Sequence, residues 1–401
     1  MIHFGADVLL VAIALSAALL ASKASARVSV PAAALFLVAA AVASDLFPAL
    51  TLSIGAVEKL ATIALIVILF DGGASIGWQR FRVAAVPVAT LGVAGTFATA
   101  GVVTLFAHWA LGLHWITAGL LGAAVAPTDP AVMFSVLGDR EVGGRTGTIL
   151  EGESGANDPV GIALMLGLVE LATHADASFW IVVRVFCEQM AIGLAIGVAG
   201  GLAESQLMRR VSLPSSGLYA IRTLAGAGIV YGLATVAHGS GFLAVFVAGL
   251  VVGDVRAPFR DEIAVFQEAL STIAEIVVFV ALGLTIDLSG VGPGRWAEGL
   301  AVAAFVALVA RPLVCGALLR PVRLDAGERL FVMWGGLKGA VPILLAAFAL
   351  AAHVTDAHRL YETVFVVVLA SVVVQGSSIP AAARLFRVEM RRTTPTPRAE
   401  R

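Results

Sequence analysis

Charged side chains are scarce in this 401-residue sequence: Asp, Glu, Lys and Arg make up 13%, against about 25% in ordinary soluble domains. Hydrophobic residues make up 59%, and the mean hydropathy is +0.97. One soluble domain cannot bury so much apolar surface, because single cores stop growing near roughly 250 to 300 residues. A water-soluble fold is therefore excluded, and lipid is the expected solvent.

The sequence also contains little cysteine, and its net charge is close to zero. Cys187 and Cys315 are the only cysteines, and neither they nor the 7 histidines have a metal-binding spacing. The 26 basic and 27 acidic residues leave a net charge of -1. The sequence therefore has no overall excess of positive charge that would indicate nucleic acid as a partner. No cofactor and no resident metal are expected.

Windows of about 20 apolar residues, the length that spans a bilayer, recur along the whole chain. They predict an all-α membrane protein with about thirteen transmembrane helices, comprising residues 1–387, and a short basic cytoplasmic tail at 388–401. We interpret the first window as a helix and not a secretory signal, because no basic residue precedes Lys23. The expected spans are 6–22, 28–44, 56–71, 83–107, 115–137, 147–173, 179–203, 217–237, 239–253, 266–287, 296–319, 328–352 and 360–386.

The distribution of basic residues predicts the orientation. With these spans, only Lys59, Arg184, Arg295 and Arg359 lie in loops on one side, whereas most of the 26 basic residues lie on the other. Basic loops stay in the cytoplasm. We therefore expect a cytoplasmic C-terminus and, with an odd number of spans, an N-terminus outside.

Two of the spans carry helix-breaking residues at mid-length. Pro127 and Pro130 flank Thr128-Asp129 in the fifth span, and Gly335 to Pro342 surround Lys338 in the twelfth. Proline removes a backbone donor and disfavours helix in the preceding residue. Two interrupted helices in corresponding positions are typical of transporters built from inverted repeats. We expect two six-helix repeats whose broken helices cross, with Asp129 and Lys338 at opposite helix ends.

The sixth span supplies further polar groups. Ser154 and Asp158 share one helical face, as do Glu153 and Asn157. Carboxylate, hydroxyl and freed carbonyl oxygens suit a hard cation such as sodium or potassium. One carboxylate that holds either a cation or a proton is sufficient for exchange. Asp71, which closes the third span, is either a residue of the cation pathway or an interfacial cap.

The run Glu151-Gly-Glu-Ser-Gly-Ala-Asn-Asp-Pro159, with Thr128-Asp129 before it and Gly336-Leu-Lys-Gly-Ala-Val-Pro342 after it, resembles the monovalent cation:proton antiporters of the NhaP and sodium/proton exchanger group. The likeness is closest to the bacterial cell-volume-regulation, potassium/proton branch. It extends to Leu69-Phe-Asp-Gly-Gly73 and Val374-Gln-Gly376.

The resemblance implies a homodimer in the bacterial inner membrane, with core and dimerisation domains, that exchanges cation and proton by alternating access. It implies that Asp158 binds the cation and the proton. The residues expected around it are Thr128, Asp129, Ser154 and Asn157. The resemblance also implies an ion pair between Glu153 and a basic residue of the twelfth span. That residue is usually arginine in the family, and here it is Lys338, whose amine can lose its proton inside a protein.

Two other readings stay open. A passive cation channel or a symporter on the same scaffold would use the same polar residues. An intramembrane serine protease would use Ser154, within a Gly-x-Ser-Gly match, and His238 on a later span. The protease reading leaves Asn157, Asp158 and Lys338 unexplained.

Overall fold

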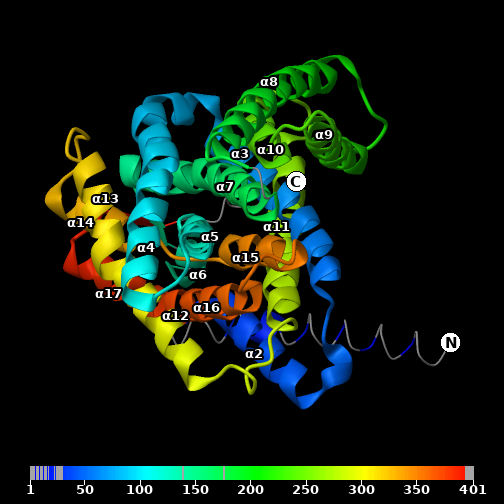
Figure 1. Cartoon of the computed structure of the whole chain (residues 1–401). Helices are drawn as coiled ribbons and strands as arrows, with labels where there is room; N and C mark the ends of the chain where they lie inside the picture. The colour runs from blue at the N-terminus through cyan, green and yellow to red at the C-terminus, as the bar shows by residue number, and fades with distance from the viewer. Residues whose placement is uncertain are drawn as a thin grey trace.

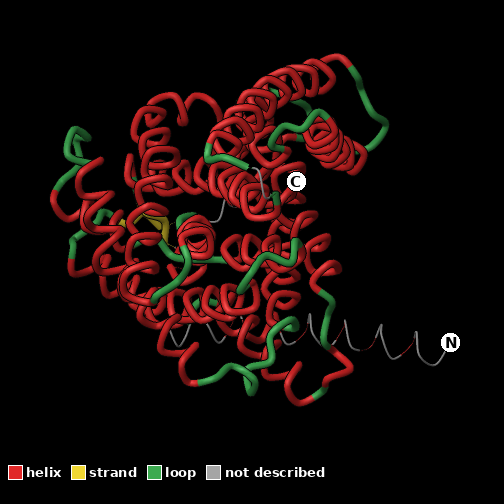
Figure 2. The backbone as a smooth tube through the Cα atoms, in the orientation of Figure 1, coloured by secondary structure: helices red, strands yellow, loops and turns green. Residues whose placement is uncertain are grey.

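The computed structural model describes residues 30–137, 140–174 and 177–392, with isolated positions before residue 30. This part of the chain is almost wholly helical (Figure 2). Within it, 7 helices are long and apolar enough to cross a membrane, and shorter apolar helices accompany them. The protein is therefore an all-α, multi-pass membrane protein. Most of the expected first span and the tail beyond residue 392 lie outside the described residues.

The helices correspond to the expected spans from residue 28 onward, although the count of thirteen stays a prediction. Short π-helical turns, labelled η2 (Thr90–Gly95), η3 (Val306–Ala310) and η4 (Ser371–Gly376), continue three of them. The α-helices are α2 (Ala32–Leu46), α3 (Ile54–Ala89), α4 (Thr96–Leu111), α5 (Trp115–Val125), α6 (Pro130–Leu137), α7 (Gly144–Thr173), α8 (Trp180–Arg210), α9 (Ser216–Val236), α10 (Gly241–Gly253), α11 (Arg260–Gly283), α12 (Pro293–Phe305), α13 (Arg311–Leu318), α14 (Ala326–Trp334), α15 (Ala340–Ala351), α16 (Ala357–Ala370) and α17 (Ser377–Leu385).

The third and fourth expected spans are not separated by a loop. They form one helical rod, Ile54–Leu111, that bends at Gly77. Gly77 has a φ of 68°, which glycine adopts without strain. A Cβ at this position would lie 2.7 Å from Asp254 Oδ1. Asp254 Oδ2 accepts a hydrogen bond of 2.7 Å from Gln79 N, a backbone donor that the bend leaves free.

Both predicted helix breaks are present. The first separates α5 from α6 at residues 126–129, and the second separates α14 from α15 at residues 335–339. The two non-helical segments meet, because Asp129 N donates to Leu337 O at 2.8 Å. Irregular backbone at membrane depth is tolerated only where protein satisfies its polar groups, and here each break helps to satisfy the other.

Figure 1 shows how the helices are arranged, and we divide them into two groups that contact each other mainly through α3, α7 and α8. The scaffold group comprises α2, the part of α3 before Gly77, and α8 to α11. The core group comprises α4 to α7 and α12 to α17. Small residues allow close helix packing in the scaffold: Gly193, Gly197 and Gly201 of α8 lie against the backbone of α10. A division into two groups of helices was expected, whereas the role of the scaffold group in dimerisation and the inverted-repeat relation stay predictions.

A two-stranded ribbon closes one end of the core group. Strand β1 (Arg140–Val142), between α6 and α7, pairs antiparallel with β2 (Met390–Arg392), which follows α17. Gly143 N also donates to Glu389 O at 3.0 Å. The start of the expected tail is thereby attached to the connection between the two helices that follow the first break.

Candidate ion-binding site

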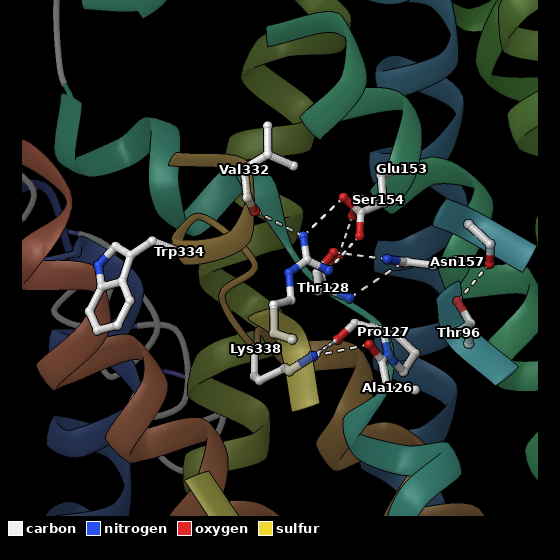
Figure 3. Close-up of polar contacts among 12 residues, drawn as sticks. Thr96, Ala126, Pro127, Thr128, Glu153, Ser154, Asn157, Val332, Trp334 and Lys338 are labelled. Atoms are coloured by element: carbon white, nitrogen blue, oxygen red, sulfur yellow. Dashed lines mark hydrogen bonds and ion pairs between the residues drawn. The ribbon is translucent and has the colours of Figure 1, made fainter. Parts of the chain in front are cut away.

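Lys338 lies at the crossing of the two breaks (Figure 3). Its side chain is fully enclosed by protein, and Nζ donates to Ala126 O at 3.0 Å and to Pro127 O at 2.9 Å. These two carbonyls are left free where α5 ends, at the negative end of its helix dipole. The ammonium therefore neutralises the end of the first broken helix, as the sequence predicts.

Asp129 belongs to the first break, and its carboxylate lies at the end of one half of the second broken helix. A Cβ built at Gly339, which immediately precedes α15, would lie 1.8 Å from Asp129 Oδ2. The carboxylate therefore lies directly against the positive N-terminal end of α15. Only glycine permits so close an approach at this position.

Thr128 lies between Pro127 and Pro130, and two residues of α7, Ser154 and Asn157, form hydrogen bonds to it. Asn157 Nδ2 donates to Thr128 Oγ1 at 2.8 Å, and Thr128 N donates to Asn157 Oδ1 at 3.3 Å. Ser154 Oγ donates to Thr128 O. All three side chains are buried. The amide and the hydroxyl thus fix the first break from the side of α7.

Asp158 is the buried acid of this arrangement. It is 6% exposed, and no hydrogen-bond donor among the described residues reaches its Oδ1. It lines a cavity of about 250 Å³ together with Ser154 and Asp129. Carboxylate and hydroxyl oxygens in this cavity are ligands that hard cations prefer.

The opposite wall of this cavity belongs to the scaffold group. This wall is formed by Asp71 of α3 and by Ser271 and Glu275 of α11. Glu151 of α7, in the core group, also lines the cavity. Asp71 therefore faces the same space as Asp158, as a pathway residue would. Glu275 was not predicted from the sequence as a residue of the site. Its signal was the four-residue spacing from Ser271, which places two polar side chains on one face in the mostly apolar C-terminal half of α11.

The expected ion pair between Glu153 and Lys338 is wrong. Glu153 is paired with Arg311 of α13, with Nη1 to Oε1 at 2.5 Å and Nη2 to Oε2 at 2.9 Å. Arg311 Nη2 also donates to Val332 O at 3.2 Å. A guanidinium can form two parallel bonds to a carboxylate, whereas the ammonium of Lys338 is already bound to the carbonyls of α5. No ion pair among the described residues includes Lys338.

A second cavity, of about 810 Å³, lies at the other end of α7. It is lined by Glu58, Glu170, Glu188 and His238, and Asp158 is not among its lining residues. Ser154 lines the first cavity and His238 lines the second. The structure therefore does not bring together the pair that a serine protease would need.

A multi-pass helical protein with two crossed, interrupted helices over a buried carboxylate has the architecture of a secondary transporter. The chain belongs to the sodium/hydrogen exchanger family, because the family's transmembrane model matches residues 11–385.

Individual relatives agree with this family. The chain is 39% identical to the K(+)/H(+) antiporter NhaP of Alkalimonas amylolytica over 333 residues, which cover 82% of this chain and 58% of the relative. It is 34% identical to the K(+)/H(+) antiporter NhaP2 of Shewanella sp. (strain ANA-3) over 378 residues, covering 92% of this chain and 65% of the relative. The chain thus spans about three fifths of the length of these relatives.

The fold is similar to that of a solved structure. The sodium proton antiporter MjNhaP1 from Methanocaldococcus jannaschii superimposes with a TM-score of 0.80 at 22% identity. The superposition covers 96% of this chain and 99% of that one.

Proposed function

We propose that this chain exchanges a monovalent cation, sodium or potassium, for protons by alternating access, one cation for one proton. The observation that carries the proposal is Asp158, a buried carboxylate that faces a cavity at the crossing of the two breaks and has one oxygen with no hydrogen-bond partner among the described residues. The printed functions of the relatives, K(+)/H(+) and sodium proton antiport, support the same activity.

In this proposal Asp158 holds either the cation or the proton. Asp129 and the oxygens of Thr128 and Ser154 complete the shell around the cation. Asn157 orients Thr128 through the two hydrogen bonds between them. The pair of Glu153 and Arg311 is structural, since both side chains are buried and their bidentate bond joins α7 to α13.

We propose that the cavity at Asp158 opens to the cytoplasm. Its lining residue Asp71 lies two turns before the bend at Gly77, which Arg80 and Arg82 follow, and Glu151 lies near the start of α7, close in sequence to Arg145. Basic loops face the cytoplasm. A phosphatase fused after Arg401 tests this orientation, because it should be inactive if the C-terminus is cytoplasmic.

We further propose that the protein resides in the plasma membrane as a homodimer in contact through the scaffold group. The resemblance to the antiporter group supports a second copy as the partner. The apolar side chains that α8 and α9 expose, among them Leu194, Leu202, Ile229 and Leu233, also support a lipid or protein contact there. Mass measurement in native nanodiscs tests the stoichiometry.

Transport itself is tested in everted membrane vesicles. After acidification, adding sodium or potassium should release protons at a rate that saturates with the cation. Lithium and rubidium complete the series and define the preference. A net current without proton movement would indicate a channel, and movement of cation and proton in the same direction would indicate a symporter.

A further inference from the structure

The Val374-Gln-Gly376 motif lies in η4, the π-helical turn between α16 and α17, and has no part in the proposed chemistry. Two polar side chains of this turn, Ser371 and Gln375, are 5% and 7% exposed. Buried polar groups in a membrane protein need hydrogen-bond partners. Single π-turns within α-helices are frequent at functional sites.

Both side chains bond to the second break. Lys338 N donates to Ser371 Oγ at 2.9 Å, and Ser371 Oγ donates to Gln375 Oε1 at 3.1 Å. Gln375 Nε2 donates to Trp334 O at 2.6 Å. Trp334 is the last residue of α14, and Lys338 lies two residues before α15. The chain of bonds therefore runs from the end of one half-helix to the start of the other.

A helix break leaves backbone carbonyls free on one side and backbone N–H groups free on the other. Gln375 satisfies a carbonyl on the α14 side, and Ser371 satisfies an N–H on the α15 side. The bond between Ser371 and Gln375 fixes the two groups relative to each other. We call this pair the Ser371–Gln375 clip.

We propose that the Ser371–Gln375 clip positions the ion-binding site by holding the backbone of Lys338. The connection continues to the site, because Lys338 Nζ bonds to Ala126 O and Pro127 O, which immediately precede Thr128 and Asp129. Ser371 and Gln375 are thus positioning residues, not ligands of the ion. This inference rests on the proposed antiport function.

The sharpest test is Gln375→Glu, which keeps the size and shape of the side chain. A protonated glutamic acid can donate to Trp334 O and accept from Ser371, whereas an ionised carboxylate cannot donate. Exchange by this variant, divided by that of the native protein at the same pH, should therefore fall as the pH rises. Gln375→Leu, which never donates, should be impaired at every pH.

Ser371→Ala removes the acceptor of Lys338 N. We expect the apparent KM for the cation to rise about tenfold, the effect of one lost buried hydrogen bond, with the maximal rate changed less than about twofold. Ser377→Ala is the matched control. Ser377 lies on the adjacent turn, and among the described residues its hydroxyl bonds to Val373 O of its own helix and to no other element. Its KM should be native.

The outcomes separate the two proposals. Native KM in Ser371→Ala together with a flat activity ratio in Gln375→Glu would overturn the clip. A drop in unfolding temperature with maximal rate lost and KM unchanged would also overturn it, because that pattern indicates a purely structural role. Absence of exchange in the native protein, measured before any variant, would instead overturn the antiport function.

Discussion

At the scale of single residues, we expect Asp158 to decide whether the site can exchange ions. It is the acid that lines the cavity with an unpartnered oxygen, and its neighbours Ser154 and Asn157 are engaged with Thr128. Asp158→Asn keeps the shape of the side chain and removes its charge and its titration. We expect exchange to vanish while the protein still purifies as a folded species.

The measurement is proton release from vesicles, with circular dichroism and gel filtration as controls for folding. Asp261→Asn is a matched control, because Asp261 is an exposed acid in the first turn of α11 and does not line the cavity. Substantial exchange by folded Asp158→Asn protein would refute the assignment.

The buried pair of Glu153 and Arg311 makes a prediction about stability. Arg311→Met leaves a buried carboxylate without its partner, and breaking such a pair costs about 3 to 5 kcal/mol. The double variant Glu153→Gln, Arg311→Met removes both charges and should recover most of that loss. Thermal unfolding in detergent measures both. If the single and double variants were equally unstable, the pair would not be the source of the effect.

The partner of Glu153 could not be predicted from the sequence. Lys338 and Arg311 are both basic residues expected within spans, and no local pattern says which of them faces Glu153 on α7. The choice depends on the helix crossing, which gives Lys338 the carbonyls of Ala126 and Pro127. By contrast, the two faces of α7 were predictable, since four-residue spacing alone places Ser154 with Asp158.

At the scale of helices, the breaks were predictable because their causes are local. Pro127 and Pro130 lack backbone donors, and Gly335, Gly336 and Gly339 weaken the second helix. The bend at Gly77 was missed for the opposite reason. The polar residues around it are typical of a loop. The group that accepts the hydrogen bond of Gln79 N is Asp254 Oδ2, which is far away in the sequence.

At Gly339 the second broken helix lies in close contact with Asp129 of the first break, so this position offers a test of that contact. Gly339→Ala would place a methyl group 1.8 Å from Asp129 Oδ2 and must displace the carboxylate. We expect the apparent cation affinity to fall by about tenfold or more, since a site that loses a charge-assisted contact loses at least about 1.5 kcal/mol.

Gly101→Ala is the control, because nothing lies within 4 Å of a Cβ at that helical position. It should bind and transport as the native protein does. Cation-dependent protection against thermal unfolding measures the affinity without relying on transport. Native affinity in Gly339→Ala would show that Asp129 is not needed where the structure places it.

At the scale of the whole molecule, the cavity lies between two groups of helices. Asp158, Asp129 and Ser154 belong to the core group, and Asp71 and Glu275 belong to the scaffold group. A movement of one group against the other would change which acids face Asp158. The larger cavity, lined by Glu58 and Glu170, lies at the opposite end of α7. We expect such a movement to connect it with Asp158 from the other side.

The charge moved in one transport cycle follows from the groups that titrate. Asn157 precedes Asp158, so the α7 pair contains one carboxylate, which we expect to exchange one cation for one proton. Lys338 is the other candidate, and no ion pair of the described residues includes it. Its ammonium is buried, which disfavours the charged form, but it donates to two carbonyls at the negative end of α5, and both contacts favour that form. We therefore expect Lys338 to stay protonated and exchange to be electroneutral.

A membrane potential imposed with valinomycin across proteoliposomes tests this expectation, with sodium as the transported cation. The rate of exchange should be the same at every potential, because equal charge moves in each direction. Lys338→Arg fixes the positive charge at this position, since a guanidinium stays protonated in proteins, and it should be equally insensitive. Voltage dependence that disappears in Lys338→Arg would show that the lysine releases its proton during the cycle. The stoichiometry would then be set by Lys338 together with Asp158, and not by Asp158 alone.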